Sequence, residues 1–115
     1  MPFFIVRRDI TRLTVDAIVN PANTSLAPGS GVCGAIYHGA GFDNMAAACE
    51  LLAPIQVGDA VITPGFKLPA KYVIHTAGPI YDPKKRAECE KQLRRAYRNS
   101  LRIAIENNCQ SIAFP

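Results

Sequence analysis

The chain has no tryptophan, only two histidines and no apolar run long enough to cross a lipid bilayer. A helix that spans the hydrocarbon layer needs about 20 predominantly apolar residues. The N-terminus also lacks the basic region and apolar core of a secretory signal. We therefore expect a soluble, cytoplasmic protein that does not bind membranes.

The four cysteines are far apart, at positions 33, 49, 89 and 109. No two of them form a C-x-x-C motif, and two histidines offer few further ligands for zinc. The sequence therefore suggests neither a metal centre nor a disulfide framework. We expect reduced thiols, no metal and no cofactor.

With 115 residues, of which 49% are hydrophobic, the chain has the size and composition of one globular domain, residues 1–115. Much of its net charge of +4 comes from lysines and arginines between residues 84 and 102. Such a run attracts polyanions such as RNA. However, Glu88, Glu90 and Glu106 interrupt it and no aromatic platform accompanies it. We interpret it as a solvated helix face, which argues against a nucleic-acid partner.

Apolar periodicity predicts strands that alternate with helices. The strands are expected at about residues 3–7, 15–20, 60–64, 71–76 and 110–114, and the helices at about 32–40, 43–52 and 86–107. This alternation indicates an α/β layered sheet in which mixed strand directions are possible.

Two further patterns predict which residues are buried. The runs 73–74 and 112–114 are continuously apolar, as is typical of central strands covered on both faces. The last helix has apolar residues at the three- and four-residue spacing of one buried face. These residues are Leu93, Ala96, Tyr97, Leu101, Ala104 and Ile105.

The stretch from Val15 to Gly41 has the layout of a phosphate-binding loop. An apolar strand is followed by Asn20 and Asn23, then by Gly29-Ser30-Gly31-Val32-Cys33-Gly34 and a helix of small residues. Glycines let consecutive N–H groups turn toward an anion, and the helix start adds unpaired N–H groups. The loop lacks both the lysine of a triphosphatase P-loop and the acidic residue of a dinucleotide fingerprint. A tight connection without a ligand fits the glycines alone equally well.

Five ordered motifs resemble those of the macro domain family, which binds ADP-ribose. They are Arg8-Asp9-Ile10-Thr11, Val15–Asn23, Gly29–Ile36, Gly58–Thr63 and Leu68–Pro79. The resemblance implies a three-layer α/β/α fold with a mixed central sheet. The family pattern continues past Pro115 with a second glycine-containing loop, a helix and a last strand. We therefore expect the N-terminal two-thirds of such a domain, with the C-terminal elements missing and an edge strand or apolar face left uncovered.

The resemblance also assigns roles to individual residues. Asp9 matches the carboxylate that accepts a hydrogen bond from the adenine amine, with Ile10 beside it. The alternative for Asp9 is a cap or turn residue. Asn23 matches the asparagine that holds the distal ribose, and its alternative is an Asx-turn residue. The expected ligand-binding set is completed by Ala22, Gly29, Ser30, Gly31, Val32 and Cys33.

Asn23 and Cys33 are the candidates for a catalytic role. In the hydrolase branch of the family, the position of Cys33 is often an aspartate that positions or activates water. A thiol replaces a carboxylate as a general base near neutral pH only when its pKa is lowered. Three interpretations of Cys33 stay open: a packing residue, a polarised thiolate near the ribose, or an incidental side chain where the substrate phosphate orients the water.

Other polar residues near the loop are given no catalytic role. His38 follows Cys33 by five residues, which rotates the two side chains apart by about 140° on a helix. Tyr37, four residues after Cys33, either faces the ligand or packs. Asn20 is expected to tie down the loop, and His75 to be a hydrogen-bonded histidine within the sheet.

The resemblance therefore implies recognition of ADP-ribose. In the complete domain it also implies hydrolysis of ADP-ribosyl esters, as in Appr-1''-p processing, de-ADP-ribosylation of proteins or deacetylation of O-acetyl-ADP-ribose. The expected partners are ADP-ribose, ADP-ribosylated protein and O-acetyl-ADP-ribose. The alternative, motivated by Cys33, is a binding module without turnover.

Overall fold

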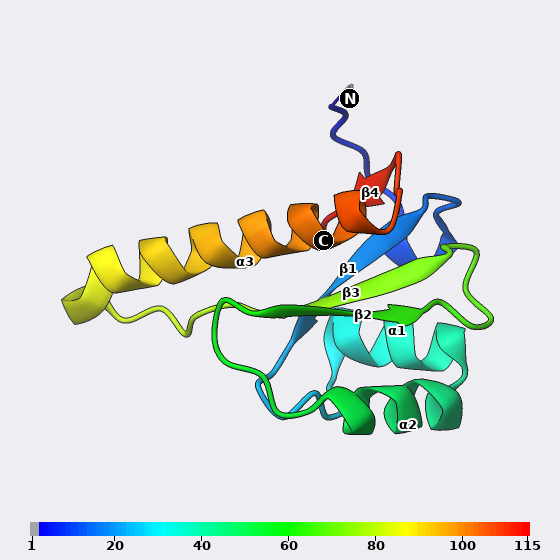
Figure 1. Ribbon diagram of the computed structural model, residues 1–115, viewed down its shortest axis with the longest axis horizontal. Coiled ribbons are helices and arrows are strands. Elements are labelled where there is room, and N and C mark those ends of the chain that lie inside the picture. Colours follow the sequence, from blue (N-terminus) through cyan, green and yellow to red (C-terminus); the bar gives the residue numbers. More distant parts are fainter. Residues whose placement is uncertain (1–2) are drawn as a thin grey trace.

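The computed structural model describes residues 3–115, which form a four-stranded mixed sheet between two layers of helices (Figure 1). The strands are β1 (Ala17–Ala22), β2 (Ala60–Pro64), β3 (Tyr72–Ala77) and β4 (Ile112–Ala113), in the order β2-β3-β1-β4. Strand β1 is parallel to both β3 and β4, whereas β2 is antiparallel to β3. The predicted mixed α/β sheet is therefore confirmed.

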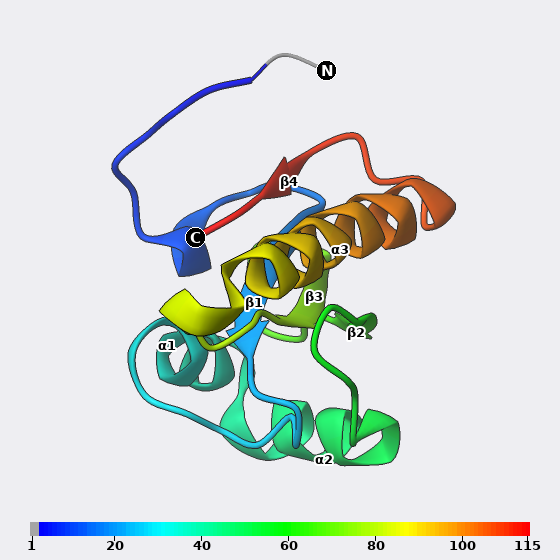
Figure 2. The same ribbon diagram turned by 90° about the vertical axis from the view of Figure 1, so that its left-hand side faces the viewer.

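The helices lie on both faces of this sheet. They are η1 (Ile10–Arg12), α1 (Gly31–Ala40), α2 (Phe42–Leu52), η2 (Pro83–Lys85) and α3 (Arg86–Glu106). Figures 1 and 2 show α1 and α2 on one face and α3 alone on the other. Within residues 3–115, no helix is long and apolar enough to cross a membrane.

Strand β1 supplies side chains to both apolar layers because successive residues of a strand point to opposite faces. Ile18 belongs to the cluster that contains Ile36 of α1, whereas Val19 belongs to the cluster that contains Ala104 of α3. Ile18, Val73 and Ile74 are buried, as expected of central strands. The rigid centre of the sheet therefore carries the loops that follow β1 and β3.

Two of the predicted strands differ from the structure at one edge of the sheet. Residues 3–7 form no strand, and Phe3 and Ile5 are 86% and 89% exposed. The segment 112–114 was expected in a central strand, but β4 has two residues and lies at the edge, paired with β1. A segment becomes a strand only beside a neighbour that pairs with its N–H and C=O groups, and within residues 3–115 the sheet includes no strand that pairs with residues 3–7.

The predicted buried face of α3 is also only partly buried. Ala96 and Ala104 are covered by the sheet, whereas Leu93 and Ile105 remain 47% and 70% exposed. The reason is that α3 packs across β2 and β3, and no second helix lies beside it within the described residues (Figure 2).

Candidate functional site: a glycine loop at the carboxyl edge of the sheet

The predicted loop follows the central strand β1 and lies at the carboxyl edge of the sheet. Parallel strands β1 and β3 end in register, at Ala22 and Ala77, and residues 23–30 then connect β1 to α1. The segment that follows β3 leaves from the same edge and exposes Ile80 and Tyr81, at 92% and 66%. In open α/β sheets, ligands bind in the crevice outside the carboxyl ends of the strands.

Asn23 closes the first part of the loop through its side chain. Its Oδ1 accepts hydrogen bonds from Ser25 Oγ at 2.7 Å and from the Ala27 N–H at 3.0 Å. Its Nδ2 donates to the Ala27 carbonyl at 3.1 Å. These bonds make Asn23 a residue that shapes the loop, although Oδ1 accepts from the Ser25 hydroxyl and the Ala27 N–H and not from the Ser25 N–H of the expected Asx turn. The side chain is exposed and has a second N–H that the loop does not use.

Tyr37 anchors the middle of the loop to α1. Its hydroxyl donates to the Leu26 carbonyl at 2.8 Å, and both side chains are buried, at 1% and 3% exposed. Burial, with a smaller contribution from Cys49, raises the pKa of Tyr37 far above its ordinary value, so the phenol remains a donor. Sequence reasoning missed Leu26. The available signal was one large apolar residue in a loop of otherwise small or polar residues.

The loop ends in an open helix start. Ser30 is the N-cap of α1 but makes no side-chain cap hydrogen bond, and the first N–H groups of a helix have no partner within it. Gly31 has φ +59°, which favours glycine. A Cβ on Gly34 would lie 2.6 Å from the Gly29 carbonyl oxygen, so the loop requires glycine there. Residues 28–32 are exposed. Unpaired N–H groups therefore meet solvent, where an anion can accept from them.

Cys33 is buried beside this opening, and a Cβ added to Gly29 would lie 3.5 Å from its Sγ. It is 7% exposed and belongs to the apolar cluster that contains Ile36, Tyr37 and Cys49. This placement favours the packing interpretation. His38, by contrast, is exposed, so the two residues do not form a nucleophilic pair. The chain has no aspartate or glutamate between Asp16 and Asp43, so the loop and α1 provide no carboxylate to act as a general base.

Asp9 and Ile10 lie near the other end of α1. Asp9 caps η1, since its Oδ1 accepts from the N–H and the Oγ1 of Thr11 at 3.0 and 2.6 Å. These two bonds lower the pKa of Asp9. Thr11 lies against Gly39, which is about 12 Å along α1 from Gly31. The structure thus brings Ala22, Asn23 and residues 29–33 together around the loop and the start of α1, and places Asp9 and Ile10 at η1, near the other end of α1.

A buried polar chain lies beneath the site. Asn20 Nδ2 and His75 Nδ1 are 3.0 Å apart, and His75 Nε2 and Thr63 Oγ1 are 2.9 Å apart. Burial lowers the pKa of His75 to about 4, so the ring is neutral near pH 7. The Asn20 amide donates to His75 Nδ1, so the proton of the neutral ring lies on Nε2 and is donated to Thr63 Oγ1. The Thr63 hydroxyl in turn donates to Met45 Sδ at 3.4 Å. Asn20 therefore joins β1 to β3 and does not reach the loop.

Comparisons with known proteins agree on one family. A family model described as "Macro domain" matches residues 19–115. A Lactiplantibacillus plantarum "Macro domain-containing protein" is 54% identical over 111 residues, which cover 96% of this chain and 63% of the relative. The mouse "ADP-ribose glycohydrolase MACROD1" is 47% identical over 96% of this chain and 34% of its own length.

Solved structures share the fold. A variant of the Oceanobacillus iheyensis macrodomain, solved with ADPR, has a TM-score of 0.85 and 39% identity. The match covers 94% of this chain and 61% of that one. The chain therefore spans less than two-thirds of the length of each of these three proteins.

Proposed function

The chain belongs to the Macro domain family, and on that premise we propose that its glycine loop binds ADP-ribose. The observation that carries the proposal is the open start of α1, where first-turn N–H groups face solvent beside Gly29, Ser30 and Gly31. Diphosphate oxygens are suitable acceptors for such groups, and the helix dipole favours their charge. The Oceanobacillus relative with ADPR supports this choice of ligand.

The ribose on the distal side of the diphosphate would lie against Asn23. Two bonds to Ala27 and one from Ser25 already fix the orientation of this side chain. Its remaining N–H is free to donate to a ribose hydroxyl. Val32, which is 38% exposed, offers an apolar contact on the helix side. Ile80 and Tyr81 would form the facing wall, and adenine recognition by Asp9 and Ile10 stays a prediction from the resemblance.

In the whole protein we propose hydrolysis of ADP-ribosyl linkages on proteins or on O-acetyl-ADP-ribose. The name of the mouse relative, an ADP-ribose glycohydrolase, supports this activity class. Because Cys33 is buried and no carboxylate occurs between Asp16 and Asp43, water activation would fall to the substrate phosphate. The same two observations favour the second candidate, a module that binds ADP-ribose without turnover.

Calorimetric titration of ADP-ribose into the chain, with AMP as the comparison ligand, tests the binding site. We expect saturable binding of ADP-ribose that is clearly tighter than that of AMP. Asn23→Ala removes three hydrogen bonds of the loop and should weaken affinity by about tenfold or more, since 1.4 kcal/mol corresponds to a factor of ten. Asn44→Ala, an exposed position on α2, is the matched control. Undiminished affinity of the Asn23 variant would refute the site assignment.

Turnover is measured separately, as release of ADP-ribose from an ADP-ribosylated protein or as deacetylation of O-acetyl-ADP-ribose. Activity of the unmodified domain that is lost on Asn23→Ala would exclude the module without turnover. Tight binding with no release by the whole protein would exclude the hydrolase.

A further inference from the structure

Leu26, in the middle of the loop 23–30, has a backbone conformation that leucine rarely adopts. Its φ of +52° lies in the left-handed region, where the Cβ of any residue other than glycine is crowded. Such a conformation persists only where the surrounding structure imposes it, and it is common in loops that hold ligands. The Leu26 side chain is 3% exposed, so its burial is one of the constraints that impose this conformation.

Three hydrogen bonds fix the chain around Leu26. The Tyr37 hydroxyl of α1 donates to the Leu26 carbonyl at 2.8 Å, and the Leu26 N–H donates to the Asn23 carbonyl at 3.0 Å. The Ile55 N–H, from the connection between α2 and β2, donates to the Thr24 carbonyl at 2.9 Å. Of these three bonds, only the one from Tyr37 comes from a side chain. One substitution therefore removes it and leaves both backbone bonds in place.

The orientation of Asn23 depends on Leu26 through the next residue, Ala27. Asn23 Oδ1 accepts from the Ala27 N–H at 3.0 Å, and Asn23 Nδ2 donates to the Ala27 carbonyl at 3.1 Å. A change of the Leu26 φ to a negative value would turn both of these Ala27 groups away from the Asn23 amide. The bond from Tyr37 opposes this change, because it holds the Leu26 carbonyl where the left-handed conformation places it. Tyr37 therefore orients the Asn23 amide indirectly, through Leu26 and Ala27.

We propose that Tyr37 is a positioning residue that sets the selectivity of the loop for ADP-ribose over ADP. The inference rests on the proposed function, in which the free N–H of Asn23 donates to the ribose beyond the diphosphate. ADP lacks this ribose but has the diphosphate that the start of α1 would bind. Tyr37 is 1% exposed, so it acts through the loop and not on the ligand. Loss of its hydroxyl should therefore weaken the binding of ADP-ribose and spare that of ADP.

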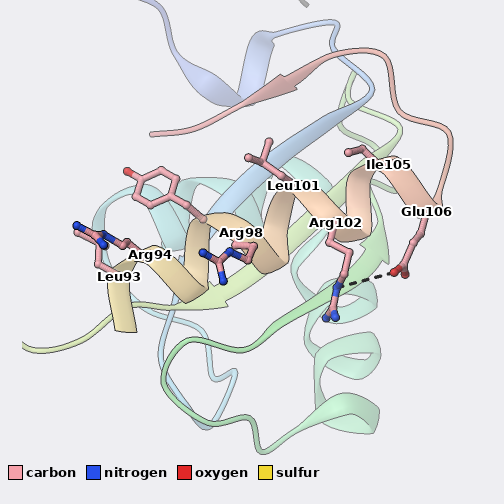
Figure 3. A pocket seen from close by; sticks show the side chains of 8 residues that line it. Leu93, Arg94, Arg98, Leu101, Arg102, Ile105 and Glu106 are labelled. Carbon is pink, nitrogen blue, oxygen red and sulfur yellow. Dashed lines mark ion pairs between the residues drawn. The ribbon is translucent and has the colours of Figure 1, made fainter. Parts of the chain in front are cut away.

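The residues that hold the loop lie on the face of the sheet that carries α1 and α2. Leu26, Tyr37 and Ile55 all belong to the apolar cluster between the sheet and these two helices. A hollow of about 680 Å³, which Leu93 and Leu101 help to line, lies along α3 on the opposite face (Figure 3). The contacts of Tyr37 are therefore independent of what covers α3.

Calorimetric titration of the whole chain with ADP-ribose, and separately with ADP, tests the proposal. Tyr37→Phe should weaken the affinity for ADP-ribose by about fivefold or more, the scale of one lost hydrogen bond, and change the affinity for ADP by less than about twofold. Tyr97→Phe is the matched control, because it removes a hydroxyl from a residue of α3 that is 46% exposed, and it should change neither affinity. Circular dichroism verifies that each variant is folded.

A double-mutant cycle with Asn23→Ala shows whether Tyr37 acts through Asn23. If it does, the double variant should bind ADP-ribose no more weakly than Asn23→Ala alone, because substitutions within one network are not additive. Incorporation of 4-aminophenylalanine at position 37 keeps a donor at the same place and should restore the affinity of the unmodified chain. Hydrogen exchange needs no variant: the Ala27 amide should be protected before any ligand is added, because Tyr37 already fixes the loop.

Several results would overturn the inference and leave the site assignment intact. One is that Tyr37→Phe changes the affinities for ADP-ribose and ADP equally, or changes neither. Additive effects in the double-mutant cycle, or rapid exchange of the Ala27 amide in the chain without ligand, would have the same consequence. Absence of ADP-ribose binding, or undiminished affinity of Asn23→Ala, would instead overturn the proposed function and with it this inference. The two failures are therefore distinguishable.

Discussion

Acidification from about pH 7.5 to about pH 4.5 should destabilise the chain through one buried side chain, His75. The ring has no exposed surface, and burial lowers its pKa from 6.5 to about 4. In the unfolded chain the ring takes up a proton near pH 6.5, whereas the folded ring stays neutral down to about pH 4. The unfolded state therefore binds more protons across this window, and stability rises with pH there.

The size of the effect follows from the two pKa values. The stabilisation is fully present above the unfolded pKa and is lost as the pH falls toward the folded pKa. The expected loss is about 1.4 kcal/mol at about pH 5.5 and about 2.5 kcal/mol at about pH 4.5. The lowered pKa of Asp9 acts below this window, and the raised pKa values of Cys49 and Cys109 act above it.

Urea unfolding at several pH values, followed by far-UV circular dichroism, measures this slope. His75→Gln should remove the slope, whereas the same substitution at the exposed His38 should preserve it. Because the chain has only two histidines, NMR titration of their ring protons also gives the pKa of His75 directly. A flat stability profile between about pH 7.5 and 4.5, or a His75 pKa near its ordinary value of about 6.5, would refute the reasoning.

Three further predictions concern the loop and the N-terminal segment. Gly34→Ala should lower both stability and ADP-ribose affinity, because a Cβ there would lie 2.6 Å from the Gly29 oxygen, whereas Gly78→Ala, with nothing within 4 Å, should not lower stability; thermal unfolding and calorimetry measure both. Tyr37→Phe removes the bond to the Leu26 carbonyl and should cost about 1–3 kcal/mol in urea unfolding if that oxygen stays unpaired. The double variant Phe3→Ser, Ile5→Ser should reduce light scattering and change the unfolding free energy by less than about 0.5 kcal/mol, since both side chains are exposed.

Local signals were enough to predict the helices and the central strands. Helices α1, α2 and α3 begin and end within about one residue of the predicted bounds, because Gly41 and Asn107 mark helix ends in the sequence itself. The larger errors lie on one side of the sheet, at residues 3–7, at β4 and along the exposed face of α3, whereas β1 begins and ends two residues later than the predicted 15–20. Apolar periodicity indicates that a side chain favours burial. It does not indicate whether the same chain supplies the helix or strand that covers that side chain.

The site was predictable only as far as its geometry depends on neighbours in sequence. Cys33, Tyr37 and Ala40 are three and four residues apart on one helix, and this spacing alone turns all three toward the core. The Tyr37 bond to Leu26 additionally requires the loop to fold back onto α1. The pairing of Asn20 with His75 requires the register between two strands 55 residues apart. Because tertiary packing decides those contacts, the sequence predicts a ligand site at the loop but neither the Tyr37 bond that anchors the loop nor the Asn20–His75 contact within the sheet.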